Sequence, residues 1–523
     1  MKKWLLFLFF CAMFQSCQKT PQKTETMRFC FHSDPTSLDP RKNADVYTSN
    51  LLFMVYEGLT RLLPEGKVEL ALAESVDISE DGKTYLFHLR NANWSDGVPV
   101  TAHDFEHSWK KILTPSFGSS CPYLLYCILN AERAINGAID PEKVGITALD
   151  DHTLKVELEN PTPYFLSLIT FCNFYPIPKH MELKNPAWHL NSFVTNGPYI
   201  VKKWDRNHEI SLVKNPQYWD AENVHLDALH ISIVSDEKTT LRMFENEDLD
   251  ILNSQTSNLS IDEVVSLRKM GKVAINRLGG TLFCTFNLER TPLNNPSIRK
   301  ALSLAIDRKA IIENISQLSE EPATRYIPSV VMPCDESLFP FCDLARAKIL
   351  FQKGVEELGF FPSEEIILNY QANELHRRIA QAIQQQWKNA FGLNIRLSES
   401  DFKTQMAFLQ NRNYSIALDS WVVQYTDPVS ILERFKFRTT KKNFPGYENQ
   451  EYIQTLNRAS AVNDAEERLH LLQKAESIMA QDMPLAPIYH FNQAILSNSR
   501  FTNLQFSPLG TLIYKKIRPS DQL

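Results

Sequence analysis

Cysteine and histidine are the side chains of this 523-residue chain best suited to covalent or metal chemistry. Of nine cysteines, two lie in or beside an apolar N-terminal run, and the odd number that remains cannot all pair within one chain. We predict a disulfide between Cys334 and Cys342, which flank a proline-bounded loop. For the other five, buried free thiols and disulfides both fit the sequence. Cysteine and histidine do not recur at zinc spacing, so we expect neither a metal nor a cofactor.

Catalytic motifs are also missing from the sequence. It contains no G-x-S-x-G elbow, H-E-x-x-H pair, P-loop or G-x-G-x-x-G turn. Carboxylate pairs that hydrolyse glycosides need only two acidic residues, so they leave no sequence signature. We predict that the protein is not an enzyme, and an exported hydrolase is the remote alternative.

The N-terminal residues have the pattern of an export signal. A basic start is followed by the apolar run Trp4 to Phe14, which is too short to cross a membrane. Ser16 and Cys17 come next, and this ending resembles a lipoprotein signal, in which the cysteine is acylated and becomes the mature N-terminus. We predict a signal peptide at residues 1–16, lipidation at Cys17 and a membrane-anchored protein of the periplasm. An ordinary cleaved signal is the alternative.

Composition narrows the classes of protein further. The hydrophobic content of 43% and charged content of 22% are ordinary for a globular protein. The net charge of −6 gives no basic bias toward nucleic acid. After the N-terminus no apolar stretch reaches the roughly 20 residues that span a membrane. The length predicts about three domain-sized units, because one hydrophobic core seldom supports so many residues.

The most informative stretch runs from Asp81 to Leu113. Apolar residues alternate over 85–89, the period of a strand with one buried face. Thr101 stands three residues before Asp104, an acidic variant of the capping box that opens a helix. Apolar residues then follow at one-face helical spacing, so the stretch predicts a strand, a loop and an amphipathic helix.

Strands and helices alternate through most of the remaining chain, which favours an α/β fold. Predicted strands lie at 27–31, 154–158, 277–287 and 393–397, and predicted helices at 50–62, 122–136, from Asn295 to 306, 375–391 and 469–479. Asn295 and Asp464 are predicted caps, and Gly392 is a predicted helix stop.

The string WSDGVPVTAHDF at 94–105 resembles the signature of the family 5 extracellular solute-binding proteins, the peptide receptors of ABC importers. Related strings occur at 193–199, 214–219 and 294–308, and the resemblance extends from about Phe29 to Ile517. It implies a two-lobed α/β periplasmic-binding-protein fold, type II-like, with an additional inserted domain and closure over a ligand. The implied boundaries are signal peptide 1–16; lobe I 17–47 plus 176–280 plus 490–523; inserted domain 48–175; and lobe II 281–489.

The same resemblance implies a function. The protein would capture oligopeptides in a cleft between the lobes and deliver them to the membrane permease of an ABC importer. Main-chain hydrogen bonds to an extended peptide ignore its side chains, whereas its terminal charges need partners in a closed cleft. The implied partners are an oligopeptide or modified peptide, the permease subunits and, through the lipid anchor, the membrane. We expect a monomer that binds no nucleic acid.

The stretch 419–428 resembles the family's Trp-x-x-Asp-Tyr-x-x-Pro string but departs from it at the key position. Gln424 replaces the Asp that receives the peptide amine, and a neutral amide cannot neutralise an ammonium. Leu418 stands where an Arg helps to bind the peptide carboxylate. The candidate replacements are Asp419 and Asp427 for the amine, and His376 or Arg412 for the carboxylate.

The complete set of predicted ligand-binding residues is Asp34, Tyr123, Asn287, His376, Phe402, Arg412, Asp419, Trp421, Gln424, Tyr425 and Asp427. Loss of two charge anchors would lower affinity for free peptide termini by orders of magnitude unless these residues replace them. The alternative is the same fold binding a modified or non-zwitterionic ligand, such as a murein peptide, a metal chelate or haem.

Overall fold

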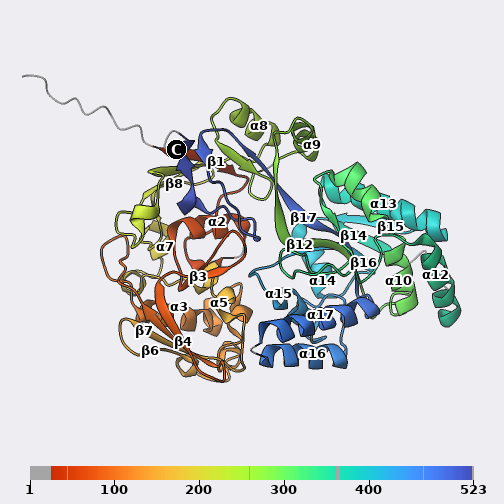
Figure 1. Ribbon diagram of the computed structural model, residues 1–523, viewed down its shortest axis with the longest axis horizontal. Helices are drawn as coiled ribbons and strands as arrows, with labels where there is room; N and C mark the ends of the chain where they lie inside the picture. Colours follow the sequence, from red (N-terminus) through yellow and green to blue (C-terminus); the bar gives the residue numbers. More distant parts are fainter. Residues whose placement is uncertain are drawn as a thin grey trace, which may run out of the picture.

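The computed structural model describes residues 25–520 apart from 44, 192, 258, 360–365 and 463. The predicted signal peptide and Cys17 therefore lie outside the described residues. Within them, helices and strands alternate as the sequence pattern predicts, and the fold is mixed α/β (Figure 1). None of the helices in this part of the chain combines the length and the apolar composition needed to cross a membrane.

A mixed sheet of eleven strands is the framework of the described chain. Its strand order is β15-β14-β16-β12-β17-β11-β1-β10-β9-β8, with β13 paired to β17 beside this path. The strands are β1 (Thr26–Phe31), β8 (Tyr199–Asp205), β9 (Glu209–Lys214), β10 (Ala228–Ile233), β11 (Ile251–Asn253), β12 (Ala274–Phe286), β13 (Glu321–Pro322), β14 (Ile367–Gln371), β15 (Arg396–Ser400), β16 (Ile416–Val422) and β17 (Leu485–Ser497).

Buried hydrophobic side chains form two large cores. The first draws on residues 27–251 and 495–517, and the second on residues 282–489. We call the parts built on these cores lobe I and lobe II. Two aromatic residues pack in the core of the other lobe: Tyr425, from the lobe II part of the chain, belongs to the first core, and Tyr164, from the lobe I part, packs against the second.

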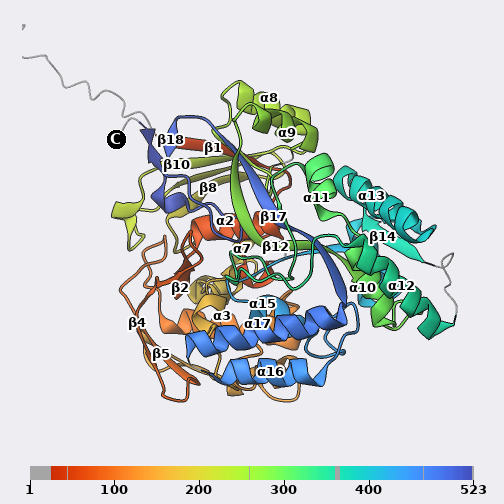
Figure 2. The same cartoon turned by 45° about the vertical axis from the view of Figure 1, so that its right-hand side comes forward.

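Strands β12 and β17 connect the lobes, and both views place them between the two parts (Figures 1 and 2). They pair antiparallel over most of their length, with a register shift between Arg277 and Thr281. Gly280 lies in this irregular segment, where an added Cβ would stand 2.6 Å from the Trp421 carbonyl oxygen. Only glycine therefore allows the backbones of β12 and β16 to approach so closely there.

A separate four-stranded sheet, in the order β4-β5-β7-β6, belongs to the first core. As predicted, the Thr101 backbone N–H donates to Asp104 Oδ2 at 2.9 Å and starts helix α3, whose buried face packs on β6 and β7. The elements are β4 (Ala73–Ile78), β5 (Thr84–Leu89), β6 (Ile146–Ala148), β7 (Thr153–Glu157) and α3 (Ala102–Ile112).

The remaining helices are α2 (Val46–Val55), α4 (Ala131–Ile135), α5 (Phe165–Leu168), α6 (Lys179–Lys184), α7 (Trp188–Asn191), α8 (Glu237–Glu245), α9 (Ile261–Lys269), α10 (Pro296–Leu304), α11 (Arg308–Ile311), α12 (Leu344–Leu358), α13 (Glu374–Phe391), α14 (Phe402–Gln410), α15 (Val429–Leu432), α16 (Gln450–Ala461) and α17 (Ala465–Asp482). The short strands are β2 (Thr60–Leu62), β3 (Val68–Leu70), β18 (Phe501–Thr502) and β19 (Arg518–Pro519).

The predicted caps are confirmed. Asn295 accepts from the N–H of Ile298 at the start of α10, and Asp464 accepts from the N–H of Glu467 at the start of α17. Gly392 follows α13 in the left-handed conformation. Side-chain caps are local interactions, which is why sequence spacing identifies them.

Three predicted elements are wrong in extent. The helix predicted at 50–62 ends at Val55, because the chain becomes extended at Tyr56 and 60–62 pairs with β3. The segment 122–136 is interrupted at Asn130, whose φ of 67° is left-handed. The strand predicted at 393–397 is displaced to β15, since pairing with β14 starts only at Arg396.

The predicted disulfide is also wrong, because Cys334 and Cys342 are both free thiols. The two side chains face different neighbours. Cys334 lies beside Arg325, whereas Cys342 lies beside Asp307 and Arg308. Closeness in sequence therefore did not bring the two sulfur atoms together.

Candidate ligand-binding site

A short hydrogen-bonded chain connects the lobes. Tyr123, in the 3-10 turn Pro122–Leu125 of lobe I, has its hydroxyl 2.9 Å from Gln424 Oε1 and 2.7 Å from Lys442 Nζ, both in lobe II. An ammonium can only donate, so the tyrosine oxygen accepts from Lys442 and its single proton goes to Gln424. This assignment directs the Gln424 oxygen to Tyr123 and leaves the amide nitrogen free to donate.

Charged groups surround this chain. The guanidinium of Arg434 lies over the indole ring of Trp421, a cation–π contact. Burial lowers the pKa of Arg434 to about 9 and that of Lys442 to about 8, and it raises the pKa of Asp419 to about 6. We call Tyr123, Asp419, Trp421, Gln424, Arg434 and Lys442 the inter-lobe cluster.

The loop that follows β16 makes further contacts with lobe I. The rings of Tyr425 and Tyr164 stack with centroids 5.6 Å apart and planes at 9°. Thr426 Oγ1 donates to the carbonyl oxygen of Gly66 at 2.8 Å, at the tip of the β2–β3 hairpin. This loop thus touches lobe I at three successive residues, Gln424 to Thr426, which brings the lobes together around the cluster.

Among the described residues, one edge of β16 is unpaired beside the cluster. On one side β16 pairs with β12 over its whole length, whereas on the other side β14 pairs only with Ile416 and Ala417. The Val423 N–H bonds the Gly279 carbonyl of β12. Since alternate residues direct their amide groups to opposite edges, Ser420 and Val422 present theirs to the open edge.

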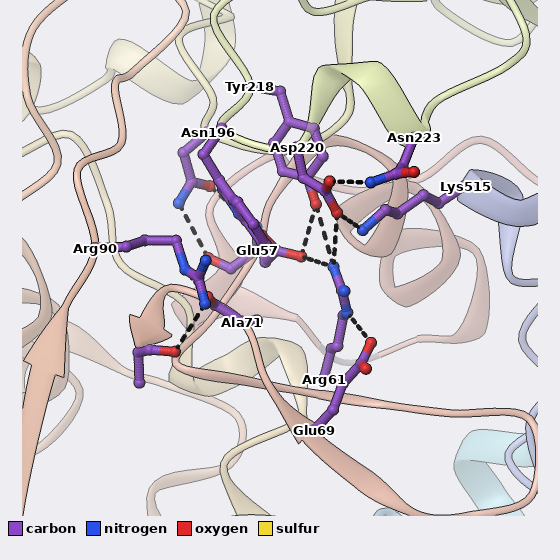
Figure 3. Close-up of polar contacts among 12 residues, drawn as sticks. Glu57, Arg61, Glu69, Ala71, Arg90, Asn196, Tyr218, Asp220, Asn223 and Lys515 are labelled. Atoms are coloured by element: carbon purple, nitrogen blue, oxygen red, sulfur yellow. Dashed lines mark hydrogen bonds and ion pairs between the residues drawn. The ribbon is translucent and has the colours of Figure 1, made fainter. Parts of the chain in front are cut away.

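A buried ion network in lobe I supports the β2–β3 hairpin (Figure 3). Glu57 accepts from Arg61 at 3.0 Å, from the Tyr218 hydroxyl at 2.8 Å and from the Trp219 indole N–H. Arg61 also pairs with Glu69 across the hairpin, and Lys515 pairs with Asp220. A cavity of about 120 Å³ adjoins the network and is lined largely by aromatic and aliphatic side chains, among them Phe53, Tyr56, Tyr175 and Leu512.

The structure brings together five of the predicted site residues, namely Tyr123, Asp419, Trp421, Gln424 and Tyr425. Asp427 is near them, but its carboxylate is bound by both terminal nitrogens of Arg468 at 2.8 and 2.9 Å. It is therefore already neutralised by a neighbour in lobe II.

The other predicted residues have different surroundings. Asp34 accepts from Trp204 and Arg206 in lobe I. The Asn287 amide donates to the carbonyl oxygens of Arg412 and Tyr414, and Arg412 in turn pairs with Glu289 at 2.7 Å.

Two more predicted residues lie at the beginnings of helices. Phe402 opens α14 and is 62% exposed. His376 is in the first turn of α13, and burial lowers its pKa to about 4, so its imidazole is neutral near pH 7. Ligand binding stays a prediction for Phe402, His376, Asp34, Asn287 and Arg412.

Arg434 and Lys442 were missed by sequence reasoning. They follow Trp421 by 13 and 21 residues, in a segment that also contains Lys436, Arg438 and Lys441. Nothing in their spacing separates the two that enter the cluster from the three that do not.

Two α/β lobes joined by long strands, with a polar cluster where they meet, define a two-lobed binding protein. The chain belongs to the bacterial extracellular solute-binding proteins of family 5, whose family model matches residues 67–443. It is 33% identical over 508 residues to the oligopeptide-binding protein OppA of Bacillus subtilis, covering 95% of this chain and 93% of that protein.

Solved structures show the same fold. The periplasmic oligopeptide-binding protein OppAIV of Borrelia burgdorferi matches with a TM-score of 0.81 and 29% identity, covering 95% of this chain and 100% of that one. Haemophilus influenzae OppA, in complex with the peptide RPPGFSPFR, matches with a TM-score of 0.79 and 27% identity, covering 95% and 99%. The fold class predicted from the sequence is thus confirmed.

Proposed function

We propose that the protein is the substrate-binding component of an ABC importer, which captures oligopeptides between its lobes and delivers them to the membrane permease. The open edge of β16 beside the inter-lobe cluster is the observation that carries this proposal. An extended peptide there would bond Ser420 and Val422 through main-chain groups, whatever its side chains. The similarity to oligopeptide-binding proteins supports the same ligand class.

Removing one edge donor tests this function. Val422→Pro deletes an N–H that faces the open edge, and an edge position tolerates proline better than a central one. We expect calorimetry to show that wild-type protein binds tri- to pentapeptides and that the variant has lost most of this affinity. Val422→Ala keeps the N–H and is the matched control. Unchanged binding by a Val422→Pro protein with the wild-type melting temperature would contradict the edge as the binding surface.

The ligand could instead be a modified or non-zwitterionic molecule. Gln424 favours this alternative, because its oxygen is already bound by Tyr123 and it carries no charge. Native mass spectrometry of protein purified without added ligand distinguishes the cases. A retained peptide mass supports the main proposal, and a retained chelate, haem or murein fragment supports the alternative.

We also propose that the protein is exported and anchored to the membrane by a lipid on Cys17. The Ser16–Cys17 sequence after an apolar run supports acylation at Cys17, which would hold a monomeric binding protein at the membrane on the periplasmic side. The intact mass of protein extracted from membranes tests this. A mass without acyl chains, or cleavage at another residue, would contradict it.

A further inference from the structure

The inter-lobe cluster has unused hydrogen-bond donors. Arg434 carries five N–H groups, and none of them has an acceptor among the described residues. The Trp421 indole N–H is buried and has no hydrogen-bond partner in the described part of the chain. Lys442 uses one N–H on Tyr123, and the Gln424 amide nitrogen likewise has no acceptor within the described chain. A group that satisfies these donors must supply several acceptor atoms.

The cluster also has an excess of positive charge, which favours the same kind of partner as its excess of donors. Two neighbouring carboxylates are already paired, Asp427 with Arg468 at 2.8 Å and Glu433 with Lys436 at 3.0 Å. The cluster itself therefore contains one carboxylate, that of Asp419, and two cations, Arg434 and Lys442. Asp419 lies outside the ion-pair distance of both, although Arg434 is close enough to lower its pKa.

A buried cation without a carboxylate partner lowers the stability of the folded protein, because desolvation favours the uncharged form. The partial burial of Arg434 and Lys442 between two lobes therefore indicates that a negative charge completes the site when ligand is present. An ammonium would find one carboxylate and two repelling cations there. A carboxylate would find at least four kinds of donor.

We propose that Arg434 and Lys442, with Trp421 and Gln424, receive a carboxylate of the bound peptide. This inference rests on the proposed function and names the class of peptide, one with an acidic group at the inter-lobe cluster. Two sources share this chemistry, an acidic side chain and the terminal α-carboxylate.

A panel of penta-alanine peptides tests the proposal. Each peptide carries one Glu or one Gln at a given position, with a free or an amidated C-terminus, and affinity is measured by calorimetry. We expect wild-type protein to bind the Glu peptide at least about tenfold more tightly than the Gln peptide at one position, or the free C-terminus at least about tenfold more tightly than the amidated one. The first pattern identifies a side chain as the source, and the second identifies the terminus.

Variants connect the preference to the cluster. Arg434→Met should abolish the preference, and Lys442→Met should reduce it. Lys441→Met changes an exposed neighbouring lysine in the same way and should leave the preference intact. Arg434→Lys keeps the charge without the planar fork and should retain part of the preference. Thermal melting of each variant checks that it folds. If Arg434→Met is unfolded, the reduced preference of Lys442→Met still tests the carboxylate site.

Three outcomes would overturn the proposal, and they differ in what they contradict. Equal affinity of wild-type protein for charged and neutral peptides, or a preference that survives Arg434→Met, contradicts the carboxylate site alone. Failure to bind any peptide of the panel contradicts the proposed function, and the inference with it.

Discussion

Two polar networks of this protein use the same kinds of residue and differ in how the charges are paired. The network around Glu57 in lobe I combines Arg61, Lys515, carboxylates and aromatic rings, and the inter-lobe cluster combines Arg434, Lys442, a carboxylate and aromatic rings. Burial lowers the pKa of Lys515 and of Lys442 alike, in each case to about 8. Burial therefore does not distinguish them.

Pairing does distinguish them. In the first network, Arg61 contacts Glu57 and Glu69, and Lys515 contacts Asp220 (Figure 3). In the cluster, Arg434 has no carboxylate within ion-pair distance among the described residues. A satisfied network stabilises its own lobe, whereas the unpaired donors of the cluster are those that we propose bind a ligand carboxylate.

The largest expected effect is on stability in the paired network. Glu57→Ala leaves Arg61, Tyr218 and Trp219 without their buried acceptor, and we expect it to lower the free energy of unfolding by about 3 kcal/mol. Urea denaturation measures this. Glu65→Ala, at an exposed position in the same hairpin, should change stability by less than about 0.5 kcal/mol. Equal effects of the two substitutions would mean that the network does not stabilise the lobe.

Removing an unpaired charge from the inter-lobe cluster should instead raise stability. Arg434→Met removes a desolvated cation that lacks a carboxylate partner, so without ligand we expect it to raise the free energy of unfolding by about 1–2 kcal/mol near pH 7. Arg438→Met is the control, because Arg438 is more exposed and paired with Glu289. Strong destabilisation by Arg434→Met would show that the cluster is structural, like the Glu57 network.

The stability of the protein should depend on pH through Asp419. Burial raises the pKa of Asp419 to about 6, so the folded protein keeps this proton over a range in which the unfolded chain releases it. The contribution of Asp419 to stability is therefore fully present below about pH 4, is lost as pH rises to about 6, and stays absent above that. Asp419→Asn should gain about 1–2 kcal/mol over wild type between pH 4 and pH 7, after allowance for partial exposure. Parallel stability curves over this range would contradict the shifted pKa.

The smallest effect is expected at the contact between Thr426 and Gly66. Thr426→Val removes the hydroxyl that donates to the Gly66 carbonyl and lies 3.3 Å from Ser167 Oγ, a loss of about 1 kcal/mol. We expect a larger radius of gyration without ligand, measured by solution scattering, and a wild-type value with saturating peptide. Unchanged scattering of wild-type protein on saturation would count against closure about β12 and β17.

Much of the local structure could be predicted. The caps at Thr101, Asn295 and Asp464 join residues three positions apart, and β5 and β7 show a plain two-residue period. Helix length was less predictable. Helix α2 ends at Val55 because the chain becomes extended at Tyr56 and then pairs as β2 with β3, a partner that lies outside the helical segment itself.

The candidate site was predicted in part. The string around Trp421 predicted residues that the structure places at the contact between the lobes. The pairing of Asp427 with Arg468 was not predicted, nor was the free state of Cys334 and Cys342. Each of these depends on which neighbours the fold supplies.

The sequence by itself determined the family and the α/β class, and it predicted that Gln424 stands where the resembling receptors have an amine-binding Asp. Only the tertiary structure decided which charges are paired and which are not. Tyr123 and Gln424 are 301 positions apart, and Tyr123 and Lys442 are 319 apart. Such contacts arise from the packing of one lobe against the other, and neither periodicity nor spacing along the chain encodes the distance between them.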